Sequence, residues 1–579
     1  MKRSWISKGL ALALTLAAIF LLWDAGIGRA RHPLAQSESP AKRIAPQQLS
    51  PDGQTSLRGI IQAGSLAELR WPDFSDYAKH MQKFYDSYGF SLPWIRGMQP
   101  TEQARQVISI LMNAAQKGLT AEDYDGPRWS DRLAKLKPAA LAPSEADAVR
   151  FDAALTVCAM RYISDLRIGK VNPRHFEFGL DVQAKKYDLP GFLEEKIVDS
   201  SAIDDALANV EPPYPGYQRA IEALGAYLEF AKEYKGNPLP PPQKTIAPGD
   251  SYAGVPQLIN LLRLLGDLPA DASVPSGTTV YEAAQVDAVK SFQRRHGRTP
   301  DGRITPQTLA DLNVPLTNRI RQMQLTLERW RWLPVSLRSA AIVANIPEFR
   351  LRVYDENYNI PLAMNVVVGK AYRHDTPVFS DSMQYVVFRP YWNVPYSIAK
   401  AEFLPRVAHD PEYLAKKGFE VVNSSQDVVT SGAVTGDMLA QLRAGKLYIR
   451  QMPGPKNSLG LVKFIFPNSS SVYMHDTPAQ EFFAKERRDF SHGCIRLEKP
   501  ADLAVWVLNE NPGWDMNRVR AAMNGAPNQQ VNLAHPIPVF ILYGTVVVTE
   551  DGIVHFYDDI YGHDAALEKV LAKGYPYPS

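Results

Sequence analysis

The spacing of apolar residues changes along the chain and separates a helical part from a strand-rich part. Within residues 101–117 apolar side chains recur with the 3.6-residue period of an amphipathic helix that ends at Gly118: Val107, Ile108, Leu111 and Ala114. A second long helix is expected after Ser144, which begins a Ser-x-x-Asp cap, and it ends before Gly169. Such patterns extend from 59 to 240 and predict a helical domain.

A smaller helical module is predicted at 248–315, behind a proline-rich linker. Its first helix has an apolar face: Leu258, Ile259, Leu261, Leu262 and Leu265. A second helix is expected over 283–296, followed by an Asp301-Gly302 turn and a short helix. A bridging helix within 316–335 then leads into the rest of the chain.

From 336 to 565 the pattern becomes strand-like. Segments such as 341–346 and 364–369 combine β-branched and apolar residues between turn residues, which is typical of strands. Between about 396 and 460 this pattern lapses, and we interpret that segment as an insertion lying over the sheet as a mobile lid. The sequence therefore predicts a multidomain α+β protein whose mainly-β domain carries a capping insertion and precedes a C-terminal tail at 566–579.

The first residues have the features of an export signal. Positive residues precede a 15-residue apolar run, 9–23, which is shorter than the roughly 20 residues of a membrane-spanning helix. We expect residues 1–30 to be either a cleaved signal peptide or a retained membrane anchor. Residues 31–58 are rich in Pro, Ser, Gln and Ala and are predicted to be a flexible linker. The remainder is expected to be exported.

Composition excludes several classes of protein. The 579 residues include 64 basic and 61 acidic side chains, and the formal charge of +3 is too balanced for nucleic-acid binding driven by phosphate neutralisation. The two cysteines, Cys158 and Cys494, form neither a disulfide framework nor a Cys-x-x-Cys zinc motif. Cys158 lies in an amphipathic helical run and is expected to be a small buried side chain.

Cys494 lies in a different setting, the segment Ser491-His-Gly-Cys-Ile-Arg. The thiolate is the reactive form of cysteine and is scarce at neutral pH, so the thiol needs a base. His492 lies two residues before Cys494 in the same turn, and its own backbone keeps its ring from swinging onto the sulfur. His475 instead ends an expected neighbouring strand, from which its ring can reach the sulfur. We therefore interpret His475 as the base and His492 as a packing or hydrogen-bonding residue. Arg496 offers a planar donor fork for a substrate carboxylate or for bracing the loop. A zinc site built from the same residues matches no common ligand spacing.

The motif, with a histidine nineteen residues before the cysteine, resembles the L,D-transpeptidase catalytic domain of the YkuD type, which is a β-sandwich. Other segments resemble the large periplasmic branch of that family: Trp330-Arg-Trp-Leu-Pro, Pro390-Tyr-Trp-Asn-Val-Pro, Phe466-Pro-Asn and His475-Asp-Thr-Pro. A third set resembles the three-helix peptidoglycan-binding domain: Phe292-Gln293, Asp301-Gly302 and Thr305. The resemblance covers roughly residues 85–570 and implies a helical scaffold domain before the peptidoglycan-binding domain.

The resemblance also implies roles for individual residues. Cys494 would be the nucleophile and His475 its general base. Tyr473 and the backbone of Gly493 and Cys494 would stabilise the oxyanion. The residues that would shape the site or line its substrate pocket are Ser491, His492, Arg496, Trp392 and Asn393, with a core position as the alternative for Trp392.

The implied reaction transfers an acyl group between peptidoglycan stem peptides in the periplasm, without a metal or organic cofactor. A thioester forms from a tetrapeptide donor stem with loss of D-Ala, and the amine of an acceptor stem resolves it to a 3→3 cross-link. Carbapenems are expected to acylate the same cysteine, and other cell-wall enzymes are candidate partners. Membrane contact is expected only through the N-terminal segment. Three alternatives stay open: an L,D-carboxypeptidase using water, a lipoprotein-attaching enzyme using a protein lysine, and a non-catalytic wall-binding scaffold.

Overall fold

The computed structural model describes residues 45–137, 144–234, 236–275, 277–335, 339–371, 374–525 and 527–577. The predicted signal peptide or anchor at 1–30 lies outside these residues, as does the linker up to residue 44. Within the described residues, no helix has both the length and the apolar character needed to cross a membrane.

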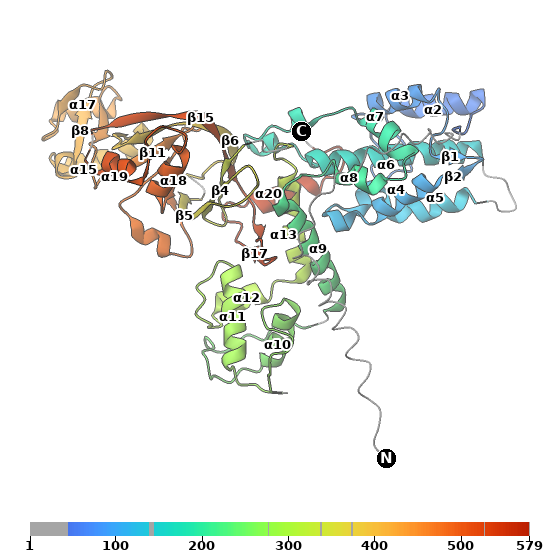
Figure 1. The fold of residues 1–579 in the computed structure, drawn as a ribbon, viewed down its shortest axis with the longest axis horizontal. Coiled ribbons are helices and arrows are strands. Elements are labelled where there is room, and N and C mark those ends of the chain that lie inside the picture. The colour runs from blue at the N-terminus through green and yellow to red at the C-terminus, as the bar shows by residue number, and fades with distance from the viewer. Residues whose placement is uncertain are drawn as a thin grey trace, which may run out of the picture. The chain divides into compact units, whose positions relative to one another are not determined.

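A helical domain forms the first part of the described chain (Figure 1). Its helices are α2 (Pro51–Ala63), α3 (Ala78–Ser87), α4 (Glu102–Met112), α5 (Trp129–Lys135), α6 (Glu145–Ile168), α7 (Leu189–Leu193), α8 (Ile203–Ala208) and α9 (Pro215–Glu233). The Ser50 hydroxyl accepts from Gly53 N at 3.1 Å and so caps α2, and Ser50 N donates to Glu145 at 2.9 Å. The linker prediction for 31–58 is therefore wrong from Ser50 onward, because those residues belong to the folded domain.

Helix α6 forms the centre of this domain and is buried along most of its length. As predicted, Ser144 caps it by accepting from Asp147 N at 3.1 Å, and Gly169 follows its last residue. Cys158 is 0% exposed, which confirms the expected buried side chain. The helix predicted over 101–117 is α4 followed by a 3-10 turn, and it ends at Gly118 in a left-handed conformation.

The next module contains three helices around one core: α10 (Val255–Leu264), α11 (Ala283–Arg295) and α12 (Pro306–Leu312). The buried Gln293 accepts from Gly302 N at 2.8 Å and donates to Asp301 at 3.1 Å. Gly302 has φ +73°, which favours glycine. The three-helix prediction is confirmed, and its motif residues hold the turn. Helix α13 (Leu316–Trp330) is the predicted bridge and packs on α9.

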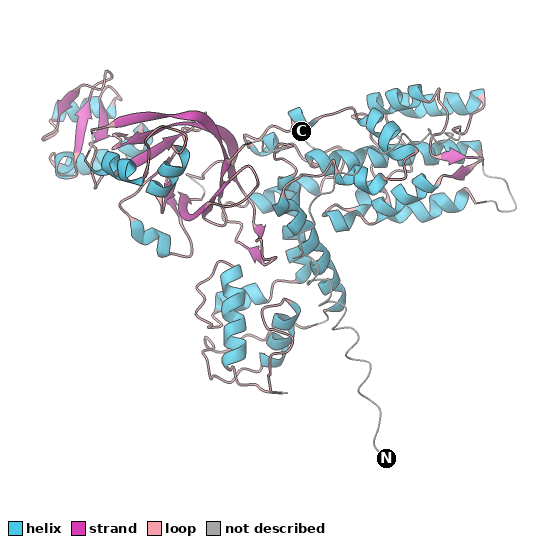
Figure 2. Ribbon diagram, in the orientation of Figure 1, coloured by secondary structure: helices cyan, strands magenta, loops and turns pink. Residues whose placement is uncertain are grey.

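The strand-rich region contains a nine-stranded sheet with the order β13-β5-β14-β12-β11-β6-β15-β3-β4. Its strands curve around one another, as the magenta arrows of Figure 2 show. Its strands are β3 (Ala341–Asn345), β4 (Arg350–Tyr354), β5 (Leu362–Gly369), β6 (Phe379–Phe388), β11 (Val462–Ile465), β12 (Met474–His475), β13 (Asp489–Ser491), β14 (Ile495–Leu497) and β15 (Gln529–Leu542). Because β4 also pairs with β5, the sheet closes on itself around a large apolar core. Helices α18 (Pro500–Val507) and α19 (Met516–Asn524) contribute to that core. The mainly-β prediction is confirmed, in the form of one curled sheet.

The expected insertion is a subdomain with its own core, here called the cap (residues 392–451). Its sheet has the order β7-β10-β8-β9, formed by β7 (Trp392–Asn393), β8 (Phe419–Val422), β9 (Val428–Thr430) and β10 (Tyr448–Gln451). Its helices are α14 (Tyr396–Ile398), α15 (Leu404–His409), α16 (Tyr413–Lys416) and α17 (Gly436–Arg443). The buried Asn457 donates to Pro390 O at 3.1 Å and Met452 O at 2.9 Å, so the two ends of the cap are tied together.

The last described residues contact the helical domain. Strands β16 (Val546–Val548) and β17 (Val554–Phe556) form a hairpin, and α20 (His563–Leu571) follows. The hydroxyl of Tyr575 then donates to Asp165, and that of Tyr577 donates to Asp123 at 3.1 Å. Within the tail predicted at 566–579, the described residues complete α20 and then contact buried carboxylates of the helical domain.

Candidate active site

Two neighbouring strands carry the predicted chemistry. β12 and β14 run parallel, with Met474 opposite Ile495 and His475 opposite Arg496. Met474 and Ile495 are buried in the core. Since side chains alternate between the faces of a strand, Tyr473, His475, Cys494 and Arg496 lie together on the opposite face. The structure thus brings together residues that lie about twenty positions apart in sequence.

The turn before Cys494 is held by close backbone packing. Gly493 has φ +114°, a conformation that favours glycine. A Cβ added at Gly369 would lie 3.0 Å from the Gly493 Cα, so the two glycines allow two backbone segments to touch. The Thr376 hydroxyl donates to Gly493 O at 2.8 Å, and the Ser491 hydroxyl donates to Cys494 O at 2.5 Å. Ser491 therefore shapes the turn, in keeping with its expected role.

The Gly493 N–H already donates to the Ser491 hydroxyl at 3.1 Å. Among the described residues, no backbone hydrogen bond engages the Cys494 N–H. Of the two backbone groups expected to stabilise an oxyanion, Cys494 N–H is thus the one left to do so. Tyr473 is the side chain best placed to assist, because its hydroxyl is in hydrogen-bond contact with the Cys494 thiol.

Cys494 is partly exposed as a residue, whereas Cys158 is buried. Burial of the Cys494 thiol itself raises its pKa, and this effect outweighs the hydrogen bonds from Tyr473 and the positive charges of Lys463 and Arg496, which lower the pKa. At neutral pH the resting side chain is consequently the neutral thiol, which needs a proton acceptor during attack.

His475 is buried, and burial together with the nearby Arg496 lowers its pKa to about 3. Its Nδ1 lies 2.5 Å from Asp476 O, so Nδ1 carries the proton of the neutral ring, and the ring also contacts the backbone of Leu459. Among the described residues, no hydrogen bond joins the His475 ring to the Cys494 sulfur. The imidazole is therefore neutral at pH 7 and able to accept a proton.

Lys463 is a site residue that the sequence analysis did not identify. It lies on β11 directly opposite His475, and its ammonium is 5.6 Å from the centre of the Tyr473 ring. Burial lowers the pKa of Lys463, and a charged Cys494 opposes that effect. The apolar run around Lys463 gives no sign of its role, because only strand pairing places it near Tyr473 and the sulfur.

Arg496 and Trp392 occupy two other sides of the thiol. Arg496 has a buried Nε without a hydrogen-bond partner among the described residues, and its guanidinium lies 5.8 Å from the Phe482 ring centre. Trp392 is in hydrogen-bond contact with Tyr473 and also packs on Phe403 of the cap at 6.2 Å. Trp392 therefore serves both as a site residue and as part of the cap core.

Asn393 is exposed and points to the strand face opposite Trp392. Its role as a pocket-lining residue stays a prediction.

His492 connects the motif turn to the cap. Its Nε2 lies 2.8 Å from the Glu402 carboxylate, and its ring stands edge-on to His374 at 4.8 Å. This contact agrees with the interpretation of His492 as a hydrogen-bonding residue of the turn. Glu402, which lies in the π-helical segment Ala399–Phe403 of the cap, was not identified from the sequence.

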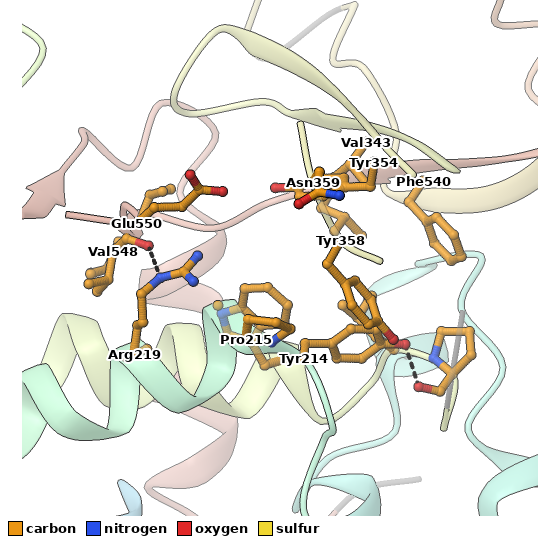
Figure 3. Close-up of a pocket in the computed structure, with 18 of the residues that line it drawn as sticks. Tyr214, Pro215, Arg219, Val343, Tyr354, Tyr358, Asn359, Phe540, Val548 and Glu550 are labelled. Carbon is orange, nitrogen blue, oxygen red and sulfur yellow. Dashed lines mark hydrogen bonds between the residues drawn. The ribbon is translucent and has the colours of Figure 1, made fainter. Parts of the chain in front are cut away.

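A separate cavity of about 330 Å³ lies between α9, α13 and the curled sheet (Figure 3). Apolar side chains dominate its walls, together with the aromatic rings of Tyr214, Tyr354, Tyr358 and Phe540. Two of its polar groups bond within the fold, since Tyr214 donates to Pro334 O at 2.6 Å and Arg219 to Val548 O at 3.2 Å. None of the candidate site residues lines this cavity, so the chemistry is assigned to the Cys494 face.

We expect alkylation of Cys494 by iodoacetamide to accelerate as pH rises from 6 to 9, because the raised pKa of Cys494 keeps the thiol protonated at neutral pH. Lys463→Met removes a charge that lowers this pKa, so its profile should move to higher pH. Lys573→Met, at an exposed site, is the matched control. A flat profile, or identical profiles for Lys463→Met and the control, would contradict this electrostatic picture.

Comparison with known proteins agrees with this geometry. Residues 339–548 match the family described as "L,D-transpeptidase catalytic domain". The chain contains an L,D-transpeptidase catalytic domain. Residues 79–224 match the "Scaffold domain" family, and residues 251–312 match the family described as "Putative peptidoglycan binding domain".

A protein of Haemophilus influenzae named "Putative L,D-transpeptidase" is 29% identical over 251 residues, or 43% of this chain and 50% of that protein. The match thus spans about half the length of that relative. Scaffold, peptidoglycan-binding and L,D-transpeptidase domains follow one another along the chain in the order that the sequence predicted.

Proposed function

We propose that the protein is a peptidoglycan L,D-transpeptidase that acts through a thioester on Cys494 and forms 3→3 cross-links. The observation that carries this proposal is a cysteine whose thiol contacts Tyr473 and interacts with two cations, on the same strand face as a neutral His475, in a region that matches an L,D-transpeptidase catalytic domain. The matched peptidoglycan-binding domain supports peptidoglycan as the substrate. We further propose that the protein is exported to the periplasm, in line with the features of residues 1–30.

In the first half-reaction, the sulfur of Cys494 attacks the carbonyl of the third residue of a tetrapeptide stem. His475 accepts the thiol proton, and the oxyanion receives hydrogen bonds from Cys494 N–H and Tyr473, a contribution of about 3 kcal/mol per donor. The C–N bond to D-Ala breaks, and His475 returns the proton to the leaving amine. Because His475 has a low pKa, proton transfer must accompany attack rather than precede it.

In the second half-reaction, the side-chain amine of another stem attacks the thioester carbonyl. The new C–N bond forms, the C–S bond breaks, and the sulfur recovers a proton through His475. Arg496, with its unpartnered buried Nε, is positioned to bind a carboxylate of either stem.

The acceptor is tested by mass spectrometry of the products formed from purified disaccharide tetrapeptide. A cross-linked dimer shorter by one D-Ala is expected. Tripeptide alone would instead identify an L,D-carboxypeptidase, and products formed only with a lysine-containing lipoprotein would identify an attaching enzyme. If neither a product nor a thioester forms, the protein would be assigned as the non-catalytic wall-binding scaffold.

We also propose that the cap is a lid whose position over the thiol depends on the Glu402–His492 contact. Acylation of Cys494 should then slow hydrogen exchange across 396–460. Glu402→Ala should raise the ratio of hydrolysis to transfer several-fold, because an unlatched cap admits water to the thioester. Glu412→Ala, which alters an exposed cap carboxylate, is the control. Unchanged exchange on acylation, together with an unchanged ratio in Glu402→Ala, would contradict the lid.

A further inference from the structure

A second cleft, of about 600 Å³, lies between the peptidoglycan-binding module and the curled sheet. One wall comes from the α11–α12 connection, 294–300, and the other from 347–352 and 484–488. Seven cationic side chains but only three carboxylates line it: Arg294, Arg298, Arg350, Arg352, Lys485, Arg487 and Arg488 against Glu348, Glu486 and Asp558. The cleft is therefore strongly positive, although the chain as a whole is nearly neutral.

The carboxylates present neutralise only part of this charge. Glu348 pairs with Arg352 at 2.6 Å, and Asp558 pairs with Arg298 at 2.8 Å. Among the described residues, no carboxylate forms an ion pair with Arg294, Arg350, Lys485 or Arg488. The Arg488 guanidinium donates to Phe349 O at 3.2 Å, and its buried Nε has no partner. Four cations thus line the cleft without a direct ion pair among the described residues, although Glu348 and Glu498 lie near enough to act on Arg350 and Arg488.

The walls of the cleft are held together by direct contacts. The Thr299 N–H donates to Glu486 at 2.5 Å, across the two modules. The ring of His296 stacks on Phe556 of β17 at 5.6 Å. These contacts fix the module against the catalytic domain, so the cations form a preorganised surface.

The cleft reaches the catalytic site through two phenylalanines. The Lys485 ammonium lies 5.7 Å from the Phe482 ring centre and 5.4 Å from that of Phe490. The Arg496 guanidinium lies 5.8 Å from the same Phe482 ring. A ligand in the cleft can therefore extend along Phe482 and Phe490 to Arg496 and the thiol.

We propose that this cleft binds the free carboxylates of a peptidoglycan stem peptide and guides that stem between the peptidoglycan-binding module and Cys494. The inference rests on the proposed function. It goes further by identifying the anionic stem, rather than the neutral glycan, as the part that the cleft recognises. Planar guanidinium groups match carboxylates in geometry as well as in charge.

Binding of disaccharide tetrapeptide is measured by calorimetry on full-length Cys494→Ala protein, which cannot turn the ligand over. Adding Arg294→Gln and Arg350→Gln should weaken binding about ten-fold, because each change removes one unpaired cation. Adding Arg105→Gln and Arg520→Gln, at exposed sites of α4 and α19, removes the same charge elsewhere and should change binding less than two-fold. A muropeptide with amidated carboxylates should bind the parent protein about as weakly as the free-acid form binds the cleft variant.

Equal affinities of the cleft variant and the parent would overturn the inference, as would equal affinities for amidated and free-acid muropeptides. The proposed function is tested separately. The intact mass of the wild-type protein is measured after incubation with the same muropeptide, to detect the thioester. A missing thioester would refute the transpeptidase proposal even if the cleft variant binds weakly. A thioester together with an unaffected cleft variant would refute the cleft alone.

Discussion

Replacing Cys494 by alanine is expected to abolish D-Ala release and cross-linking while the protein keeps its cooperative melting transition. The sulfur is the atom that forms and breaks the acyl bond, so no neighbouring group can take its place. Its side chain is only partly buried and lies at a turn outside the main core, so stability should change by less than about 1 kcal/mol. Released D-Ala and the melting curve are the two measurements.

Cys158→Ala provides the matched control, because Cys158 is fully buried in the helical domain and far removed in sequence from the site. A carbapenem should add one adduct to wild type and to Cys158→Ala, and none to Cys494→Ala, by intact mass. D-Ala release that persists in Cys494→Ala, or an adduct on Cys158, would disprove the assignment of the nucleophile.

His475→Ala is expected to slow acylation by about 10²–10⁴-fold, the usual range for loss of a general base. The thiol has a raised pKa and the imidazole is neutral at pH 7, so removing the imidazole leaves the thiol without an acceptor for its proton. Alkaline pH should partly restore the variant, since the thiolate then forms without help. Single-turnover thioester formation followed by mass spectrometry measures this rate.

His492→Ala is the comparison, since His492 contacts Glu402 of the cap rather than the sulfur. Its effect on acylation should be at least ten-fold smaller. If both variants show the same rate and the same pH dependence as wild type, neither histidine is the base. If His492→Ala is the slower of the two, the roles predicted here are reversed.

The core of the site could be predicted because its residues lie in short contiguous motifs. Ser491-His-Gly-Cys and His475 are separated by one connection, and alternation along two strands places them on one face. Lys463 and Glu402 could not be predicted, because their positions depend on the β11–β12 pairing and on how the cap packs. The hydrogen bond from the Gly493 N–H to the Ser491 hydroxyl likewise could not be predicted from the sequence.

Prediction of the fold was limited in the same way, because elements fixed by distant contacts could not be predicted. Helices α4 and α6 follow from local periodicity and capping. Helix α2 was missed because residues 31–58 have the composition of a linker. Its start is fixed by Ser50, whose backbone and hydroxyl bond Glu145, 95 positions later in the chain. A contact at that separation has no signature in local composition.

The docking of Tyr575 and Tyr577 on Asp165 and Asp123 has a consequence for biogenesis. Burial raises the pKa of Asp165 to about 8. The hydroxyls that bond Asp165 and Asp123 belong to Tyr575 and Tyr577, which follow these carboxylates in the sequence by 410 and 454 positions. The helical domain can begin to form early, but its polar interior closes only after residues 575 and 577 have been synthesised. Completion of the helical domain thereby depends on a segment that follows the strand-rich domain in the sequence.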